Sequence, residues 1–207
     1  RTEEADGLTA LFDEIDYAYV ADWHHRSASA ARLGNAKREA NAGHTGEEPY
    51  NWFLAVLFPA SQLKVLPYNR VVVDLNGYEP AALLDEIRKV CTVYENLAPE
   101  PEKPGQISMY IKGQWIGLVR NDKPEDPISA LDVSFLQDKI LAPLLDVDDP
   151  RTSPRVDFVG GIRGAGELEK LVDSGKCGVA FSLYPVSVEQ LIAIADADEI
   201  MPPKSTW

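Results

Sequence analysis

The segment AYVADWHHRSASAAR, residues 18–32, gathers side chains that can bind an anion. In this segment Asp22 is followed at short spacing by His24, His25 and Arg26. Imidazole and guanidinium groups donate hydrogen bonds to phosphate oxygens, and a guanidinium can do so through two parallel bonds. These residue types at this spacing predict a binding site for a small anion.

The residues on either side of the cluster predict the elements that position it. Tyr17, Tyr19 and Val20 are aromatic or β-branched and predict a short strand, whereas the alanine-rich stretch 27–32 predicts a helix. The cluster would then lie at a strand-to-helix turn, which is where α/β proteins commonly bind ligands. The first turn of the helix would add unpaired N–H groups and a positive dipole end, and both attract an anion.

Two other interpretations of the cluster stay open. Asp22 and the two histidines match an Asp-x-His-His pattern found in metal-dependent phosphoesterases. A metal site would need further ligands, but the chain has only three histidines and His44 falls in a predicted loop. We therefore predict no metal ion bound by Asp22, His24 and His25. Alternatively, Asp22 caps the helix and the basic residues form a solvated surface.

Two further segments carry candidate phosphate ligands. In LPYNRVV, Asn69 and Arg70 stand among apolar residues, so Arg70 is either an exposed residue of an edge strand or a second anion ligand. In MPPKSTW, two prolines stiffen the approach to Lys204, Ser205 and Thr206.

The glycine-rich stretch VGGIRGAGE, residues 159–167, predicts a plain turn. It lacks the final Lys-Ser or Lys-Thr of a phosphate-binding P-loop, and its glycines do not fit the G-x-G-x-x-G register. No serine, cysteine or threonine stands in a nucleophile-elbow context, so a catalytic triad is not predicted.

The hydrophobic patterning predicts helices, strands and two connectors. Helices are expected over 3–14, 27–32, 80–97, 132–145, 167–174 and 188–195. Strands are expected over 17–20, 50–59, 62–77, 156–159 and 178–184, with Pro67 marking an edge or a bend and a hairpin over 107–120 turning at Lys112-Gly113. A loop is expected over 41–49, and the two connectors are expected over 98–105 and 146–155.

This pattern predicts an α/β to α+β fold, with a mixed sheet and flanking helices. We expect two segments, 1–98 with the DWHHR turn and the LPYNR strand and 99–207 with the hairpin and the KSTW end, or one intertwined domain. The chain starts at Arg1 and its last residue is Trp207, directly after MPPKST, and we interpret it as a piece of a longer protein.

Composition limits the classes of function. The chain has 207 residues, of which 45% are hydrophobic and 26% charged, as is usual for globular proteins. Its net charge of −13 argues against nonspecific binding to nucleic acid or to an anionic membrane, although a local basic site for a small anion remains compatible with it.

The sequence predicts a cytoplasmic protein with reduced thiols. The longest apolar run, residues 53–59, is too short to span a bilayer, and nothing resembles a signal peptide. Cys91 falls in a helical pattern and Cys177 in a predicted strand, without a CxxC pair, so neither a disulfide framework nor a zinc site is expected.

Three motifs together resemble the domain of unknown function 1015 family of bacteria and archaea. They are YVADWHHRSASAAR, FLAVLFPASQLKVLPYNRVVVDLNG and GVAFSLYPVSVEQLIAIADADEIMPPKSTW, and they stand in the family's order. The first is similar to the phosphate-binding turn of the ParB/sulfiredoxin-like superfamily, in which the ADP-dependent free serine kinase carries Asp-Gly-His-His-Arg. The resemblance implies nucleotide phosphates bound by His24, His25 and Arg26, with Asp22 orienting them or assisting a metal.

The resemblance further implies a nucleotide-dependent phosphotransferase of the kinase type with a ParB/sulfiredoxin-like core that is incomplete in this chain. It implies ATP or ADP with Mg²⁺ as cofactor, a small-molecule or nucleotide partner, and catalytic roles for Asp22 and His25. Asn69, Arg70, Lys204, Ser205 and Thr206 would bind or neutralise phosphate charge. The alternatives are a non-catalytic, nucleotide-responsive binding module and a folded scaffold whose site is disabled.

Two departures from the family pattern bear on these alternatives. Trp23 stands where the family motif has glycine, and a glycine there would let the backbone approach a phosphate closely. The indole could fill the pocket or strain the turn. An upstream segment with a His-Glu motif, which would supply the catalytic acid or base, has no counterpart in this chain.

Overall fold

The computed structural model describes residues 3–22, 24–95 and 97–207. The chain divides into unit 1, Arg1–Pro59, and unit 2, Ala60–Trp207, and each is described here by itself. The division falls after Pro59, and strands from both sides of residue 98 pair in one sheet.

Unit 1 contains helices and loops among its described residues. Helix α1 (Glu3–Phe12) confirms the helix predicted over 3–14, and α2 (His24–Ala40) confirms and extends the one predicted over 27–32. The predicted loop over 41–49 is confirmed and leads into a 3-10 turn, η1 (Pro49–Asn51).

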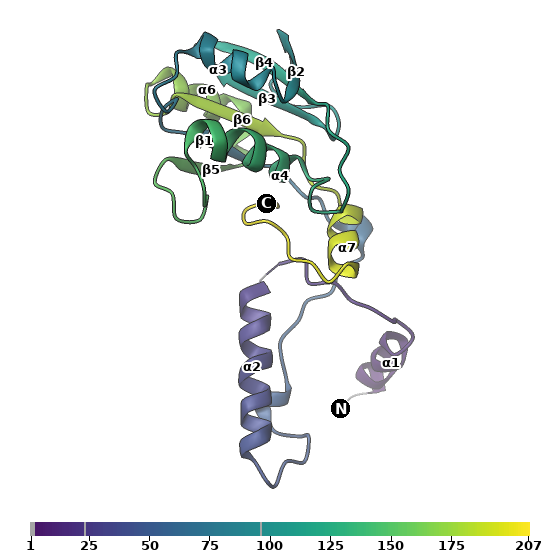
Figure 1. The fold of residues 1–207 in the computed structure, drawn as a ribbon. Helices are drawn as coiled ribbons and strands as arrows, with labels where there is room; N and C mark the ends of the chain where they lie inside the picture. Colours follow the sequence, from purple (N-terminus) through teal and green to yellow (C-terminus); the bar gives the residue numbers. More distant parts are fainter. Residues whose placement is uncertain (1–2, 23, 96) are drawn as a thin grey trace. The chain divides into compact units, whose positions relative to one another are not determined.

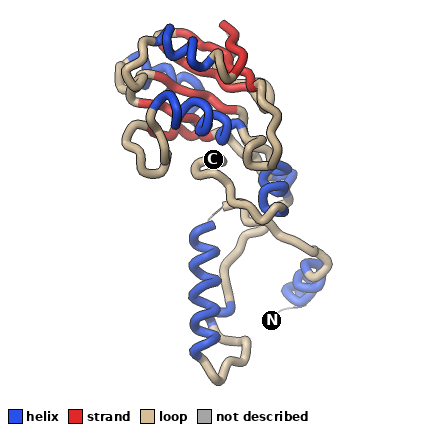
Figure 2. Tube along the Cα trace, viewed as in Figure 1, coloured by secondary structure: helices blue, strands red, loops and turns tan. Residues whose placement is uncertain are grey.

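The two strands predicted in unit 1, over 17–20 and 50–59, are wrong for the structure described. Figure 2 shows both segments mainly as loop, and their side chains are exposed, with Tyr17 at 78% and Leu54 at 89% exposure. Aromatic and β-branched residues favour a half-buried pleated surface rather than an isolated extended chain. Within the described part of this unit, no neighbouring strand pairs with them.

Unit 2 is built on one six-stranded sheet with helices on both faces (Figure 1). The strands are β1 (Tyr68–Val72), β2 (Cys91–Glu95), β3 (Gln106–Ile111), β4 (Gln114–Arg120), β5 (Val156–Gly160) and β6 (Val179–Leu183). Their order is β2-β4-β3-β6-β1-β5, and every described pairing is antiparallel. The sheet with flanking helices is confirmed, and its strand directions are more uniform than the predicted mixed sheet.

The helical elements of unit 2 are short. They are η2 (Ala60–Gln62), α3 (Pro80–Ile87), α4 (Asp132–Leu136), the π-helical η3 (Gln137–Leu141), α5 (Ala142–Leu145), η4 (Gly161–Arg163), α6 (Gly164–Asp173) and α7 (Val188–Asp196). Together α4, η3 and α5 confirm the helix predicted over 132–145, and α6 and α7 confirm those predicted near the end of the chain.

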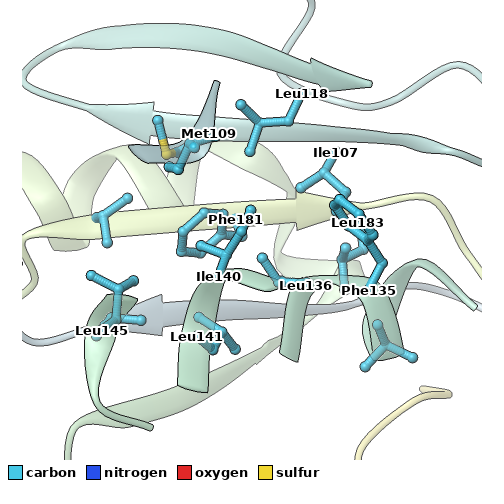
Figure 3. Close-up of a cluster of buried hydrophobic side chains, with 14 of the residues drawn as sticks. Ile107, Met109, Leu118, Phe135, Leu136, Ile140, Leu141, Leu145, Phe181 and Leu183 are labelled. Carbon is cyan, nitrogen blue, oxygen red and sulfur yellow. The ribbon is translucent and has the colours of Figure 1, made fainter. Parts of the chain in front are cut away.

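The core lies on both faces of the sheet, because successive strand residues point to opposite sides. On one face, Phe181 of β6 packs with Leu136 and Ile140, as Figure 3 shows. On the other face, Val71 of β1 belongs to a smaller cluster with Leu168 of α6. The next residue of β1, Val72, belongs to the larger cluster, so successive residues of this strand pack on opposite faces of the sheet.

The hairpin prediction is confirmed at its turn. Lys112 and Gly113 have φ values of 48° and 77°, the left-handed backbone that a two-residue type I′ turn requires. The connectors predicted over 98–105 and 146–155 lie outside helices and strands at all residues that the structure describes.

The helix predicted over 80–97 is right as far as Ile87 and wrong beyond it. Residues from Cys91 onward form β2 and pair with β4, so Cys91 lies on a strand and not on a helix. The apolar spacing of residues 80–97 fits a helix, but residues 91–95 instead form backbone hydrogen bonds with β4 at the edge of the sheet. Cys177 lies just before β6, and both cysteines are free thiols.

Pro67 was predicted to mark an edge strand or a bend, and the edge strand is wrong because β1 lies between β6 and β5. Pro67 precedes β1, so its missing N–H costs the sheet no hydrogen bond. Its carbonyl accepts a hydrogen bond from the backbone N–H of Gly161. No helix in the described part of the chain is long and apolar enough to cross a bilayer.

Replacing Phe181 by alanine should lower the free energy of unfolding of unit 2 by about 3–5 kcal/mol, because the ring is fully buried in the larger cluster. Chemical denaturation followed by circular dichroism measures this. The control is Ile162→Ala, whose side chain is 69% exposed and should change the free energy by less than about 0.5 kcal/mol. Equal losses in both variants would contradict the assignment of the core.

Candidate functional site

The first turn of α2 carries the predicted anion-binding cluster. His24, His25 and Arg26 are the first three residues of this 17-residue helix. The structure therefore confirms the helical half of the predicted strand-to-helix turn, and a loop takes the place of the strand. Arg26 is exposed, and the side chains of the two histidines lie outside the described part of the structure, as does Trp23.

The charge at the start of α2 is the reverse of the usual one. Helix N-termini favour acidic side chains because the helix dipole is positive there, and α1 follows this rule with Glu3, Glu4 and Asp6. The first turn of α2 contains no acidic residue and includes an arginine.

Asp22 stands two residues before α2 and is exposed. Its predicted role, as a catalytic group or as one that orients the ligands, stays a prediction. Among the residues that the structure describes, no three of the types His, Cys, Asp and Glu gather closely enough to hold a metal ion.

The loop after α2 is fixed by the carboxylate of Glu48. This carboxylate accepts hydrogen bonds from the backbone N–H of Thr45 at 2.8 Å and of Gly46 at 3.0 Å, and from the side-chain amide of Asn51 at 3.0 Å. The Thr45 hydroxyl donates a further bond. These bonds, that from the Thr45 N–H foremost, lower the pKa of Glu48 to about 2.

Tyr50 ties this loop to the end of α2. Its hydroxyl lies 3.0 Å from the amide nitrogen of Asn41 and 3.0 Å from Nδ1 of His44, whose ring stacks on that of Tyr50. His44 also contacts Glu48 at 3.0 Å. The histidine that the sequence places in a loop thus has a structural role, which its position alone did not indicate.

The Glu48 contacts predict an acid-sensitive loop. Because the folded pKa of about 2 lies below the ordinary value of 4.5, their stabilisation is present above pH 4.5 and is lost as the pH falls toward 2. Carboxyl resonances of Glu48 and ring resonances of Tyr50, followed by NMR, should both titrate in that range.

A Glu48→Gln variant should lose this pH dependence of the Tyr50 resonances. The neighbouring variant Glu47→Gln should keep it, because the Glu47 side chain is exposed. Titration of Glu48 near 4.5 in the parent protein would show that the loop does not hold the carboxylate in this way.

In unit 2, Arg70 is a buried cation with only 3% of its surface exposed. Its guanidinium donates to the carbonyl oxygens of Tyr68 and Lys204, the second at 2.9 Å, and lies 5.4 Å from the ring centroid of Phe158. Among the described residues, no carboxylate lies within ion-pair distance of it. Burial lowers the pKa of Arg70 to about 9.

Arg120 is a buried arginine with the opposite environment. Burial lowers its pKa, but the hydrogen bonds and charges of Asp122 and Asp132 outweigh this and the net shift is upward. Its guanidinium lies 2.7 Å from Asp122 and 3.4 Å from Asp132. The chain therefore neutralises one buried arginine with carboxylates and satisfies the other with carbonyl groups.

The prediction that Arg70 is exposed on an edge strand is wrong. Strand β1 is interior, and Arg70 stands opposite Phe158 on one side and Phe181 on the other. Its side chain therefore shares a face with the larger apolar cluster. The neighbouring Asn69 is also buried, and its side-chain oxygen accepts the backbone N–H of Leu183 at 3.0 Å, which extends the pairing of β1 with β6.

The KSTW segment lies against the start of β1. Leu66 and Trp207 exchange two backbone hydrogen bonds, of 2.9 and 3.1 Å. The ammonium group of Lys204 lies 5.5 Å from the ring centroid of Tyr68, and the Lys204 carbonyl accepts a hydrogen bond from Arg70. Residues more than 130 positions apart in sequence are thereby brought together.

Ser205 and Thr206 complete this group of predicted ligands. Ser205 is buried, and its hydroxyl donates to the carbonyl of Pro202 at 2.5 Å, whereas Thr206 is partly buried. Trp207 packs on Gly160, where a Cβ atom would lie 2.6 Å from the indole nitrogen. Nothing in the sequence singles out Tyr68, Phe158 or Trp207, although Tyr68 and Trp207 lie within the LPYNRVV and MPPKSTW motifs.

Replacing Arg70 by lysine should lower the free energy of unfolding by about 1–3 kcal/mol, because one ammonium cannot satisfy both carbonyl groups from the same position. Chemical denaturation measures the change. The matched control is Arg151→Lys, an exposed arginine paired with Asp149, where a change below about 0.5 kcal/mol is expected. An unchanged free energy of unfolding in the Arg70 variant would contradict a stabilising role for the two bonds from Arg70 to the carbonyl groups of Tyr68 and Lys204.

Comparisons with known proteins give one family and two structural likenesses. The family model described as "Protein of unknown function (DUF1015)" matches residues 1–134. No curated protein matches the sequence. Two solved structures of mutant free serine kinase in complex with AMP match with a TM-score of 0.49 and 14% identity. Each match covers 91% of this chain and 66% of the other, so the chain spans just under two thirds of those proteins.

Proposed function

The chain belongs to the DUF1015 family of proteins of unknown function, and we propose that it binds the phosphate groups of a nucleotide. The observation that carries this proposal is the first turn of α2, where His24, His25 and Arg26 occupy the positive end of a helix that has no acidic residue there. A bound anion would interact favourably with the positive end of the helix dipole and would accept hydrogen bonds from backbone N–H groups of the first turn.

The proposed ligand is a phosphate group because of the donors that are available. The guanidinium of Arg26 can form two parallel bonds to phosphate oxygens, and each imidazole can donate one more. With a net charge of −13, the chain as a whole repels polyanions, so a small, locally bound anion is favoured over nucleic acid.

The proposed reaction is phosphoryl transfer from ATP or ADP to a small-molecule hydroxyl group. This reaction depends on positioning and on neutralising the charge of the transferred group. Asp22 and His25 would take the acid–base role, while His24 and Arg26 hold phosphate oxygens. Mg²⁺ bound to the nucleotide would neutralise further phosphate charge.

Unit 2 supplies a second group of candidates, considered separately. Arg70 is a buried guanidinium without a carboxylate partner among the described residues, and Lys204 and Ser205 lie beside it in the KSTW segment. We propose that Arg70 and Lys204 neutralise phosphate charge and that Asn69, Ser205 and Thr206 contribute hydrogen bonds to phosphate. Both Arg70 contacts are to carbonyl groups, so these residues also hold the KSTW segment in place.

Pyrophosphate should bind the parent protein saturably, and Arg26→Ala should weaken this binding by about tenfold or more, since hydrogen bonds between charged groups contribute about 1.5–3 kcal/mol. Calorimetric titration with pyrophosphate, ADP and ATP, with and without Mg²⁺, measures this. The matched control is Arg32→Ala, which removes the same charge from an exposed position later in α2 and should change the affinity by less than about threefold.

Equal losses in the two arginine variants would show that only overall charge matters and would refute the site at the first turn. Transfer of phosphate to a hydroxyl acceptor, followed by ³¹P NMR, separates the two functional classes. Product formation supports the phosphotransferase, whereas saturable binding without product supports the nucleotide-responsive binding module. Recovery of binding only in Trp23→Gly would identify a scaffold whose site the indole blocks.

A further inference from the structure

We propose that a groove in unit 1, beside α2, holds the heteroaromatic base of the nucleotide. This proposal rests on the proposed function, because it takes the phosphates to lie at the first turn of the same helix. The groove has a volume of about 290 Å³. It is lined by Ser27, Ala30, Ala31, Gly34, Asn35, Arg38, Tyr50, Asn51, Trp52 and Phe53.

The helix side of the groove is made of small residues. Ala30, Ala31 and Gly34 recur at a spacing of three and four, which places them on one face of α2. No side chain larger than a methyl group projects from these three positions, so the surface is flat enough for a ring. At Gly34 a Cβ atom would lie 3.0 Å from the carbonyl oxygen of Tyr50, which shows how closely the following chain approaches the helix.

Two aromatic residues line the groove opposite these small residues. Trp52 is 61% exposed and Phe53 is 53% exposed, although both belong to residue types that are usually well buried. Exposed aromatic rings beside a flat surface offer a stacking platform for a planar ligand, and stacking on such rings accepts any base. A heteroaromatic ring fits this pair of walls better than a branched aliphatic group.

Polar groups at the groove select a ring with a hydrogen-bonding edge. Asn35 and Asn51 carry side-chain amides, which offer both a donor and an acceptor. The guanidinium of Arg38 lies 3.5 Å from the side-chain oxygen of Asn51. The side-chain amide of Asn35 and the remaining N–H groups of Arg38 can pair with the edge of a nucleobase, which a hydrocarbon ring does not allow.

The groove is held open before any ligand arrives. Glu48 accepts the amide of Asn51 at 3.0 Å, and the hydroxyl of Tyr50 contacts Asn41 and His44. These bonds fix the start of the segment that bears the two aromatic rings. A groove that is already formed does not have to be ordered on binding, which favours affinity.

Size and position agree with a nucleoside. Pockets for small ligands usually measure about 300–1,000 Å³, so this groove lies at the small end of that range. It begins at Ser27, the residue directly after Arg26, and extends along the helix toward Arg38. A base in the groove and phosphates at the first turn would therefore belong to one ligand.

The test compares two leucine substitutions in α2. Ala31→Leu fills the groove, whereas Ala28→Leu adds the same side chain at an exposed position that does not line it. Calorimetric titration with adenosine, pyrophosphate and ADP should show adenosine and ADP binding weakened about tenfold or more by Ala31→Leu and unchanged by Ala28→Leu. Pyrophosphate affinity should stay the same in both variants. Circular dichroism checks that α2 is intact.

A second variant, Trp52→Ala, keeps the helix surface and removes one stacking ring, and it should also weaken ADP binding by about tenfold. ADP and adenosine affinities that are unchanged in both Ala31→Leu and Trp52→Ala would overturn the groove proposal while leaving the phosphate site untouched. Absence of pyrophosphate binding, with adenosine still blocked by Ala31→Leu, would instead refute the phosphate site and support the groove. Absence of adenosine and ADP binding would refute the base site.

Discussion

The pairing of β1 with β5 on one side and β6 on the other is the interaction on which unit 2 depends. It makes β1 an interior strand, and strand alternation then sends Val71 and Val72 into clusters on opposite faces. The same alternation places Arg70 among apolar rings, where its charge must be satisfied. Carbonyl groups at the start of β1 and in the KSTW segment supply the partners, so the sheet also fixes the end of the chain.

Both candidate groups contain an arginine: Arg26 lies in a first turn without acidic residues, and Arg70 is buried beside an aromatic ring. The chain is acidic overall and pairs Arg120 with two aspartates, yet it leaves the first turn of α2 without an acidic residue. Arg70 likewise has no carboxylate partner among the described residues. We propose an anionic ligand for this local positive charge in a protein with many more acidic than basic residues.

Local signals in the sequence were sufficient for some elements and insufficient for others. The hairpin was predictable because its turn depends on the local backbone of Lys112 and Gly113, both of which have positive φ. Helix α2 was predictable because its alanine-rich composition favours a helix. The end of α3 and the strand at Cys91 depend on pairing with β4, a partner distant in sequence. The candidate residues Arg70 and Lys204 could be named from their types, but their contact depends on the order of strands in the sheet.

The central claim is that an anion binds the first turn of α2. NMR spectra of the backbone amides, recorded during titration with pyrophosphate, test it most directly. The account predicts saturable shifts at the amides of Arg26 and Ser27, because these N–H groups lie where the anion binds. It predicts no matching shifts at Ala5 and Asp6, the same positions in the acidic first turn of α1. Unchanged amides at the start of α2, or equal shifts in both helices, would contradict it.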